Sequence, residues 1–162
     1  MAAARTQSHY QEIVNRILVP VDFSDCSRTA LRYAVSLARP LKASLILLYV
    51  AETNPAGSEL IPWHVSDLET DLRQMAKQKL AQLIKQDVPA TIASQSVIRA
   101  GRSDSEILEV ATHLKVALIV MATHSKDSPQ GQLGTTAGRV AGLASCPVLL
   151  VPVKELTVPF FL

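Results

Sequence analysis

The chain is poor in aromatic residues, in net charge and in cysteine, and each shortage excludes a class of protein. Phe, Trp and Tyr together make up 4% of the 162 residues, so we expect a core of Leu, Val, Ile and Ala. The formal net charge is +2, and no stripe of Lys and Arg interleaves with aromatic residues, so we expect no nucleic-acid partner. Hydrophobic residues make up 48%, which predicts one compact domain rather than a disordered chain.

Long apolar runs are also missing from the sequence. None approaches the roughly 20 residues that a helix needs to cross a bilayer, so we expect no membrane association. Residues 1–15 lack the apolar centre of a secretory signal and are interpreted as an N-terminal extension. Cys26 and Cys146 have no metal-ligating partners at useful spacing, which favours two free thiols, no bound metal and a cytoplasmic location. A reactive role for Cys26, in the first turn of a predicted helix, is the alternative.

Sequence motifs for catalysis are absent as well. There is no Gly-x-Ser-x-Gly turn, no Walker phosphate loop and no carboxylate pair spaced for acid–base chemistry. His9, His64 and His113 have no acidic or cysteine partner at ligand spacing, so we assign them no chemistry. The sequence therefore predicts a protein that is not an enzyme and has no catalytic residues.

Five apolar runs alternate with helical patterns along the chain. This alternation, with short connections, predicts an α/β fold: a single doubly wound domain with a five-stranded parallel sheet and helices on both faces. Residues 51–63 contain two prolines and a glycine and are predicted to be a loop. The expected strands are residues 16–21, 44–50, 91–99, 116–121 and 146–153. The expected helices follow Ser24 and span residues 65–85, 103–113 and 135–143.

Local signals indicate where these helices begin and which sides they bury. Ser24 is expected to cap the first helix, and residues 103–106 have the Ser-x-x-Glu pattern of a capping box. Gly138 and Gly142 lie four residues apart, and we interpret them as close packing of the last helix on a strand. In the helix over 65–85, helical spacing predicts six inward residues, Leu68, Leu72, Met75, Leu80, Leu83 and Ile84.

Two loops that are far apart in the sequence should meet at one edge of the sheet. The first follows the strand that ends near Val21, and the second spans residues 121–136. Both lie at the carboxyl ends of predicted parallel strands, which is where such sheets bind ligands. Asp22 can accept a hydrogen bond from a ligand there, or it can cap the nearby turn, and both alternatives remain open.

Five segments stand out in the order in which they follow one another along the chain: residues 17–24, 47–50, 101–103 with Ile107, 116–124 and 146–151. Together they resemble the universal stress protein family. The resemblance covers residues 16–153, so residues 154–162 are interpreted as an apolar C-terminal tail that docks on a partner. It implies strand order 3-2-1-4-5, a homodimer through the last strand, and a cytoplasmic, non-catalytic stress-response protein.

Some members of that family bind ATP through a loop of the form G-x2-G-x9-G-[ST], and others do not. Here Ala122 and Ser125 replace the first two glycines, and eight residues rather than nine precede Gly134 and Thr135. For His124 a structural or ligand-lining role is favoured over a catalytic one. The resemblance implies an adenine-nucleotide site at the carboxyl ends of strands one and four, formed by Pro20, Val21, Asp22, Val50, Met121, Ala122, His124, Ser125, Gly134, Thr135 and Thr136.

Two functions therefore remain open from the sequence. One is a stress protein that binds ATP through a degenerate glycine loop, and the other is a nucleotide-free dimeric interaction module of the same family. A third possibility, an enzyme of the wider adenine-nucleotide α-hydrolase-like group, lacks a nucleophile or a pyrophosphate-loop motif in this sequence.

Overall fold

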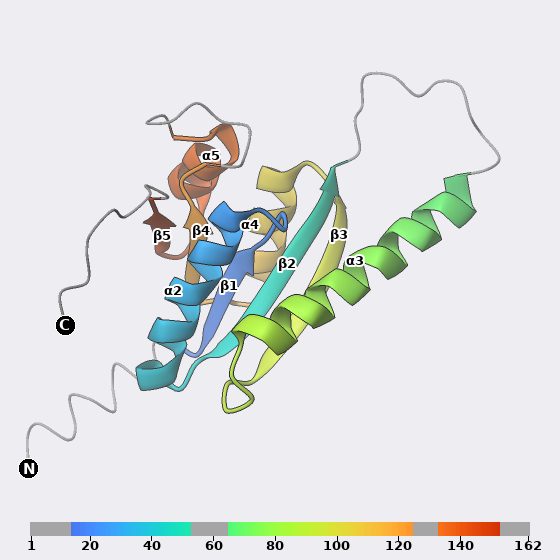
Figure 1. Cartoon of the computed structure of the whole chain (residues 1–162). Coiled ribbons are helices and arrows are strands. Elements are labelled where there is room, and N and C mark those ends of the chain that lie inside the picture. Colours follow the sequence, from blue (N-terminus) through green and yellow to red (C-terminus); the bar gives the residue numbers. More distant parts are fainter. Residues whose placement is uncertain (1–13, 53–64, 125–132, 153–162) are drawn as a thin grey trace, which may run out of the picture.

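Five parallel strands lie side by side in the order β3-β2-β1-β4-β5 (Figure 1). The computed structural model describes residues 14–52, 65–124 and 133–152. The predicted fold class and strand order are confirmed. The elements are β1 (Arg16–Pro20), α2 (Asp25–Leu41), β2 (Ser44–Glu52), α3 (Val65–Asp87), β3 (Ser94–Gly101), α4 (Ser103–His113), β4 (Leu118–Ala122), α5 (Thr135–Leu143) and β5 (Val148–Val151).

Some element boundaries differ from the prediction. The third strand begins at Ser94 rather than at residue 91, because the Ile92 amide donates to the Pro89 carbonyl in a turn. The last strand is limited to Val148–Val151. Within the described residues no helix is long and apolar enough to cross a membrane. Residues 1–13 of the expected extension, and the whole expected tail, lie outside the described residues.

Alternating side chains of the central strands form two separate cores. Ile17 and Val19 of β1 pack with α2 and α3, whereas Leu18 between them packs with α4 and α5. In β2, Leu45 and Leu47 face the first pair of helices in the same way. All five side chains have an exposed fraction of 0%. Because both faces of the sheet are covered, its strands read as continuous apolar runs in the sequence.

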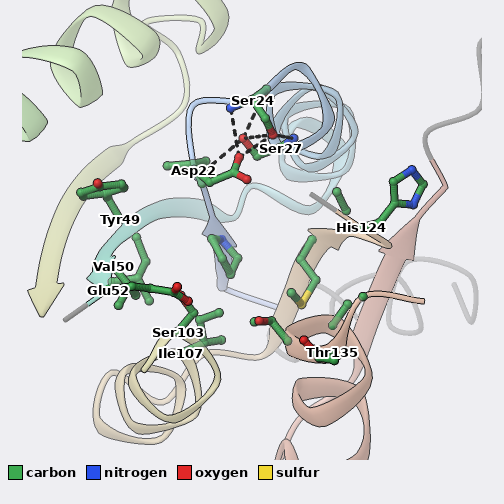
Figure 2. A pocket seen from close by; sticks show the side chains of 18 residues that line it. Asp22, Ser24, Ser27, Tyr49, Val50, Glu52, Ser103, Ile107, His124 and Thr135 are labelled. Carbon is green, nitrogen blue, oxygen red and sulfur yellow. Dashed lines mark hydrogen bonds between the residues drawn. The ribbon is translucent and has the colours of Figure 1, made fainter. Parts of the chain in front are cut away.

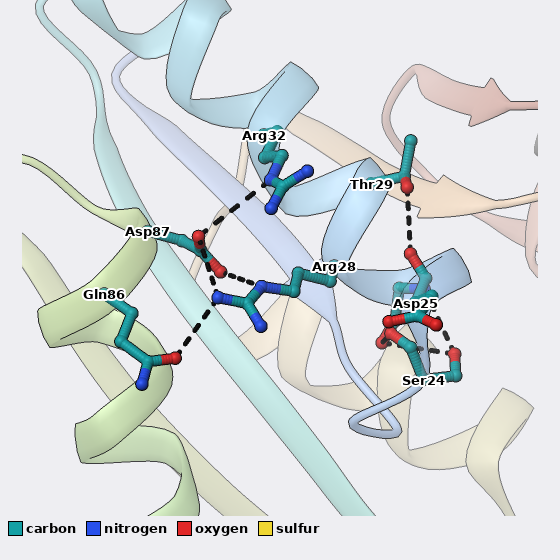
Figure 3. Close-up of polar contacts among 8 residues, drawn as sticks. Ser24, Asp25, Arg28, Thr29, Arg32, Gln86 and Asp87 are labelled. Atoms are coloured by element: carbon teal, nitrogen blue, oxygen red, sulfur yellow. Dashed lines mark hydrogen bonds and ion pairs between the residues drawn. The ribbon is translucent and has the colours of Figure 1, made fainter. Parts of the chain in front are cut away.

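Helix α2 begins at a serine cap and is tied to the end of α3. The Ser24 hydroxyl oxygen accepts a hydrogen bond from the Ser27 amide at 3.2 Å, so the predicted cap is confirmed. Figure 3 shows Arg28 of α2 reaching across to Asp87, the last residue of α3. The Nε and Nη2 groups of Arg28 each donate to one oxygen of that carboxylate. These two hydrogen bonds hold α3 against α2 on one face of the sheet.

The predicted inner side of α3 is wrong at two positions. Ala76 and Leu80 are buried, but Leu72 and Met75 are 54% and 53% exposed. Figure 1 shows the beginning of α3 extending away from the strands, and Leu72 lies one turn before Ala76, the first buried residue among those described in this helix. Met75 is adjacent to Ala76 in the chain, and its side chain therefore points to a different side of the helix. The side chain of Leu68, also predicted to face inward, lies outside the described residues.

The capping box predicted at residues 103–106 does not form. Helix α4 already includes Ser103, and the N-cap is Arg102, whose side chain makes no capping hydrogen bond. Gly101, with a φ of 149°, makes the turn from β3 into this helix in a conformation that favours glycine. The Ser103 hydroxyl donates instead to Glu52 Oε1 at the end of β2, at 2.7 Å.

The two glycines of α5 do not provide the close packing that their spacing suggested. A Cβ atom added at Gly138 would make an ordinary contact of 3.5 Å with the Leu133 side chain. Among the described residues, a Cβ atom added at Gly142 would meet nothing within 4 Å. Neither glycine is therefore required by packing against a strand.

Replacing Gly142 with alanine should raise the free energy of unfolding by about 0.5–1 kcal/mol, because alanine loses less backbone entropy in a helix. Chemical denaturation of Gly142→Ala measures this. Gly134→Ala is the contrast, since its Cβ atom would lie 3.2 Å from the Thr123 carbonyl oxygen and should destabilise the protein. A loss of stability in Gly142→Ala would contradict the prediction.

Candidate functional site

Strands β1 and β4 separate toward their carboxyl ends. In the described register, their last pair is Leu18 with Ile119. Beyond it, β1 stays with β2 through a hydrogen bond from the Val21 amide to the Leu48 carbonyl at 2.8 Å. Strand β4 stays with β5 through Ala122. Because α2 and α5 then leave on opposite faces, this gap is the switch point at which open α/β sheets bind ligands.

Pro20 contributes directly to this separation. Backbone groups along a strand point alternately to its two neighbours. The Val21 amide bonds to β2, and the Arg16 carbonyl accepts a hydrogen bond from Ala117 beside β4, so position 20 faces β4. Proline has no N–H group to donate, so β1 cannot extend its ladder to β4 at that residue. The proline thus ends the pairing where the gap begins.

The gap opens into a pocket of about 400 Å³, a volume within the usual range for small-molecule sites (Figure 2). Of the predicted site residues, Ser125 lies outside the described residues. The other ten line the pocket together: Pro20, Val21, Asp22, Val50, Met121, Ala122, His124, Gly134, Thr135 and Thr136. The pocket-lining residues that the sequence analysis missed are Ser24, Ser27, Leu48, Tyr49, Glu52, Ser103, Ile107 and Ala137.

Asp22 closes the turn between β1 and α2. Its Oδ1 atom accepts hydrogen bonds from the amide of Ser24, at 3.0 Å, and from the hydroxyl of the same residue. Burial raises the pKa of Asp22, but the hydrogen bonds from Ser24 and Ser27 together outweigh it and hold that pKa below its usual value. The turn-capping alternative is confirmed for Oδ1. Figure 2 shows the same carboxylate directed into the pocket, and its lowered pKa favours the ionised form there.

The residue after Asp22 holds this turn in a strained conformation. Phe23 has a φ of 63°, which is uncommon for a residue with a side chain. Its ring packs against Tyr49 with a centroid distance of 4.8 Å, and Lys79 Nζ lies 5.5 Å from the ring centroid. These contacts offset the backbone strain and fix Tyr49 at the wall of the pocket.

Helix α5 directs its first turn into the pocket. Gly134 is the N-cap and makes no side-chain capping bond. The first turn contains the amides of Thr135, Thr136 and Ala137, which have no hydrogen-bond acceptor within the helix. All three residues line the pocket. The Gly134 amide donates to the Thr123 carbonyl at 2.8 Å, and a Cβ atom at this position would make a tight contact of 3.2 Å with the same oxygen. The amides and the helix dipole make this end of the pocket suited to an anion.

A cluster of ion pairs joins α4 to α5 behind the pocket. The buried Asp104 of α4 accepts hydrogen bonds from Arg102, at 3.1 and 2.6 Å, and from Arg139 of α5, at 2.9 Å. The hydrogen bond from Arg102 outweighs burial and holds the pKa of Asp104 below its usual value. Asp104 therefore positions Ser103, its neighbour in α4, relative to the first turn of α5.

Asp104→Asn should weaken the acid sensitivity of folding. Since the folded pKa of Asp104 lies below its usual value of 3.8, the ion pairs stabilise the fold above that pH. Their contribution is lost as the pH falls through the folded pKa. The variant should therefore be less stable than the native protein at pH 7 and should lose less stability on acidification. Urea denaturation across pH measures this, with the exposed Glu109→Gln on the same helix as control. An unchanged acid dependence would refute it.

Metal and thiol chemistry find no support in the described part of the chain. No group of three or more His, Cys, Asp or Glu residues there could hold a metal ion. Cys26 and Cys146 are free, and burial raises the pKa of the Cys146 thiol.

The Thr123 hydroxyl lies 2.9 Å from His124 Nδ1, a contact that orients the ring at the pocket wall.

Comparisons with known proteins agree with this geometry. A sequence profile of the Universal stress protein family matches residues 14–152. A universal stress protein of Methanocaldococcus jannaschii is 30% identical over 155 residues, covering 90% of this chain and 87% of its own. A solved hypothetical protein, whose biochemical function was assigned from its structure, gives a TM-score of 0.76 at 26% identity, covering 88% of this chain and 99% of that one. A universal stress protein in complex with cAMP gives a TM-score of 0.61 at 18% identity, covering 87% and 98%, which shows the fold alone.

Proposed function

The chain belongs to the universal stress protein family, and from that premise we propose that its pocket binds an adenine nucleotide such as ATP. One observation carries the proposal, which is the opposite polarity of the two sides of the pocket. The Asp22 carboxylate faces it from the end of β1, and the first-turn amides of α5 face it from the end of β4. A nucleotide has the matching polarity, with a hydrogen-bond-donating nucleoside at one end and phosphates at the other.

The nucleoside end would lie over the carboxyl ends of β1 and β2, on the side of the pocket away from α5. Val50, Ile107 and Met121 offer apolar contacts for a base, and Asp22 offers an acceptor for an amino or hydroxyl group. A universal stress protein of the same fold has been solved in complex with cAMP, which is a property of that protein.

The phosphate end would lie at the start of α5. Thr135 and Thr136 supply two hydroxyl groups there, and the first-turn amides of Thr135, Thr136 and Ala137 lie beside them. Ala122 and Ser125 replace glycines that would allow closer backbone approach, so we expect weaker ATP binding than in a member with the full glycine loop. Each lost charge-assisted hydrogen bond costs about 1.5–3 kcal/mol, or roughly tenfold to a hundredfold in affinity.

Two substitutions should separate the ends of the site in calorimetric titrations. Thr135→Ala should weaken the binding of ATP by roughly tenfold, because a hydroxyl donor to phosphate is lost. The same substitution should hardly change the binding of adenosine. Asp22→Asn should weaken the binding of ATP and of adenosine alike, because the ionised acceptor becomes a neutral amide. The amide oxygen can still accept the hydrogen bonds from Ser24, so the turn is kept.

Matched controls keep this test sharp. Thr135→Ser retains the hydroxyl and should bind ATP like the native protein. Tight native binding that neither Asp22→Asn nor Thr135→Ala changes would place the site elsewhere. No detectable binding of ATP, ADP, AMP or cyclic AMP would refute the nucleotide proposal and leave the interaction module as the function.

The proposed role is that of a cytoplasmic stress-response protein without catalytic activity. The missing catalytic motifs and the two free thiols support it. In this role the bound nucleotide would act as a signal or a stored ligand rather than as a substrate.

The second candidate function, a dimeric interaction module, is favoured by the edge strand β5. This strand has β4 on one side and ends the sheet on the other. Leu149 of β5 and Leu143 at the end of α5 are 37% and 69% exposed. An open apolar edge invites pairing with another strand, so we propose a homodimer through β5, with or without a bound nucleotide.

Leu149→Lys should shift the protein toward monomer, because it places a charge on the proposed interface. Sedimentation velocity across a range of concentrations measures the shift. Leu72→Lys, a similarly exposed leucine on α3, is the matched control and should leave the association unchanged. A native protein that remains monomeric at every concentration would rule out the dimer.

A further inference from the structure

We propose that Glu52 and Ser103 make the pocket select nucleotides with free ribose hydroxyls and reject those that carry a further phosphate on the ribose. The inference rests on the proposed nucleotide site and specifies which ligands that site accepts. Glu52 would be the specificity-determining residue, and Ser103 would position it.

Glu52 and Ser103 meet at one side of the pocket although they are far apart in the sequence. Glu52 ends β2, Ser103 opens α4, and both line the cavity. The Ser103 hydroxyl donates to Glu52 Oε1 at 2.7 Å, and Figure 2 shows the two side chains directed toward one another. A serine hydroxyl has one proton, which this bond uses. Oε1 is thereby held in place, and no hydrogen bond to Oε2 is formed within the described residues, so this oxygen is the one that we assign to the ligand.

The charges around the cavity determine which end of a nucleotide can lie against Glu52. The described lining residues include two carboxylates, those of Asp22 and Glu52, and no Lys or Arg. A phosphate on that side would be repelled by like charge and would find no cation to pair with. Amide donors for a phosphate lie on the other side, at the first turn of α5. The nucleoside end, with its neutral hydroxyl donors, therefore fits against the carboxylates.

The position of Glu52 in the sheet supports contact with a ribose. Strand β2 lies next to β1, with Leu48 paired to Pro20. In dinucleotide-binding folds, an acidic residue at the carboxyl end of the second strand accepts a hydrogen bond from the ribose 2′-hydroxyl. Where such folds take a 2′-phosphate, an arginine nearby accommodates it. Glu52 occupies the corresponding end of β2 in this sheet, so its charge favours the hydroxyl and disfavours the phosphate.

Ser103 is fixed by its own surroundings. Its neighbours in the chain, Arg102 and Asp104, form the ion-pair cluster that reaches Arg139 of α5. The serine that orients Glu52 is thus held on the same rigid unit as the first turn of α5. The distance between the proposed ribose and phosphate contacts is set by this unit rather than by a loop.

Calorimetric titration with AMP and with adenosine 2′,5′-bisphosphate tests the proposal. The native protein should bind AMP at least about tenfold more tightly than the bisphosphate. Glu52→Gln keeps the size of the side chain but removes its charge. It should therefore weaken AMP binding and reduce the preference for AMP over the bisphosphate by about tenfold. Glu109→Gln removes the same charge from an exposed position on α4 outside the pocket and should leave the preference unchanged.

The positioning role of Ser103 has its own variants. Ser103→Ala should reduce the preference for AMP over the bisphosphate, but by less than Glu52→Gln does. Ser103→Thr keeps the hydroxyl and should have the native preference. Thermal melting of each variant shows that the fold is retained. A native protein that binds AMP but prefers neither ligand, or a preference that Glu52→Gln leaves unchanged, would overturn the inference while sparing the proposed function. A native protein that binds neither ligand would overturn the inference, and it would overturn the proposed function as well if ATP, ADP and cyclic AMP also failed to bind.

Discussion

Beyond Leu18, strands β1 and β4 follow different neighbours in the sheet, and the rest of the site is arranged around the space between them. Strand β1 continues beside β2 to the Val21 amide, whereas β4 continues beside β5 to Ala122. Pro20 lacks the donor that would have continued the ladder between β1 and β4. The chain then leaves β1 toward α2 on one face and β4 toward α5 on the other, so both connecting turns border the same cavity.

The two turns give the cavity its opposite polarity, and each is held by contacts outside the cavity. The turn after β1 carries the ionised Asp22 and is fixed by Ser24 and by the packing of Phe23 on Tyr49. The start of α5 carries amides that have no partner within the helix, and α5 is tied to α4 through Asp104. These contacts join residues of the protein to one another, so both turns are held in place beside the cavity by the fold itself.

The fold class could be predicted from the periodicity of the sequence, whereas the strand order and most of the described pocket residues were predicted from the resemblance to the family. Continuous apolar runs of strand length, alternating with helical patterns, imply a covered parallel sheet, and ligand sites lie at the carboxyl ends of its strands. Glu52 and Ser103 were missed because β2 was predicted to end at residue 50 and the serine was interpreted as a helix cap. Leu72 was misjudged because periodicity indicates which side of a helix is apolar, but not where the sheet beneath it ends.

The most direct measurement of whether the gap between β1 and β4 is a nucleotide site is amide chemical-shift mapping during titration with ATP. The gap predicts the largest changes at Val21 and Asp22, at Met121 to His124 and at Gly134 to Ala137, with smaller ones at Val50 and Glu52. Changes confined to the opposite end of the sheet, around Lys42 and Thr91, or no change at saturating ATP, would contradict the assignment of this gap as the site.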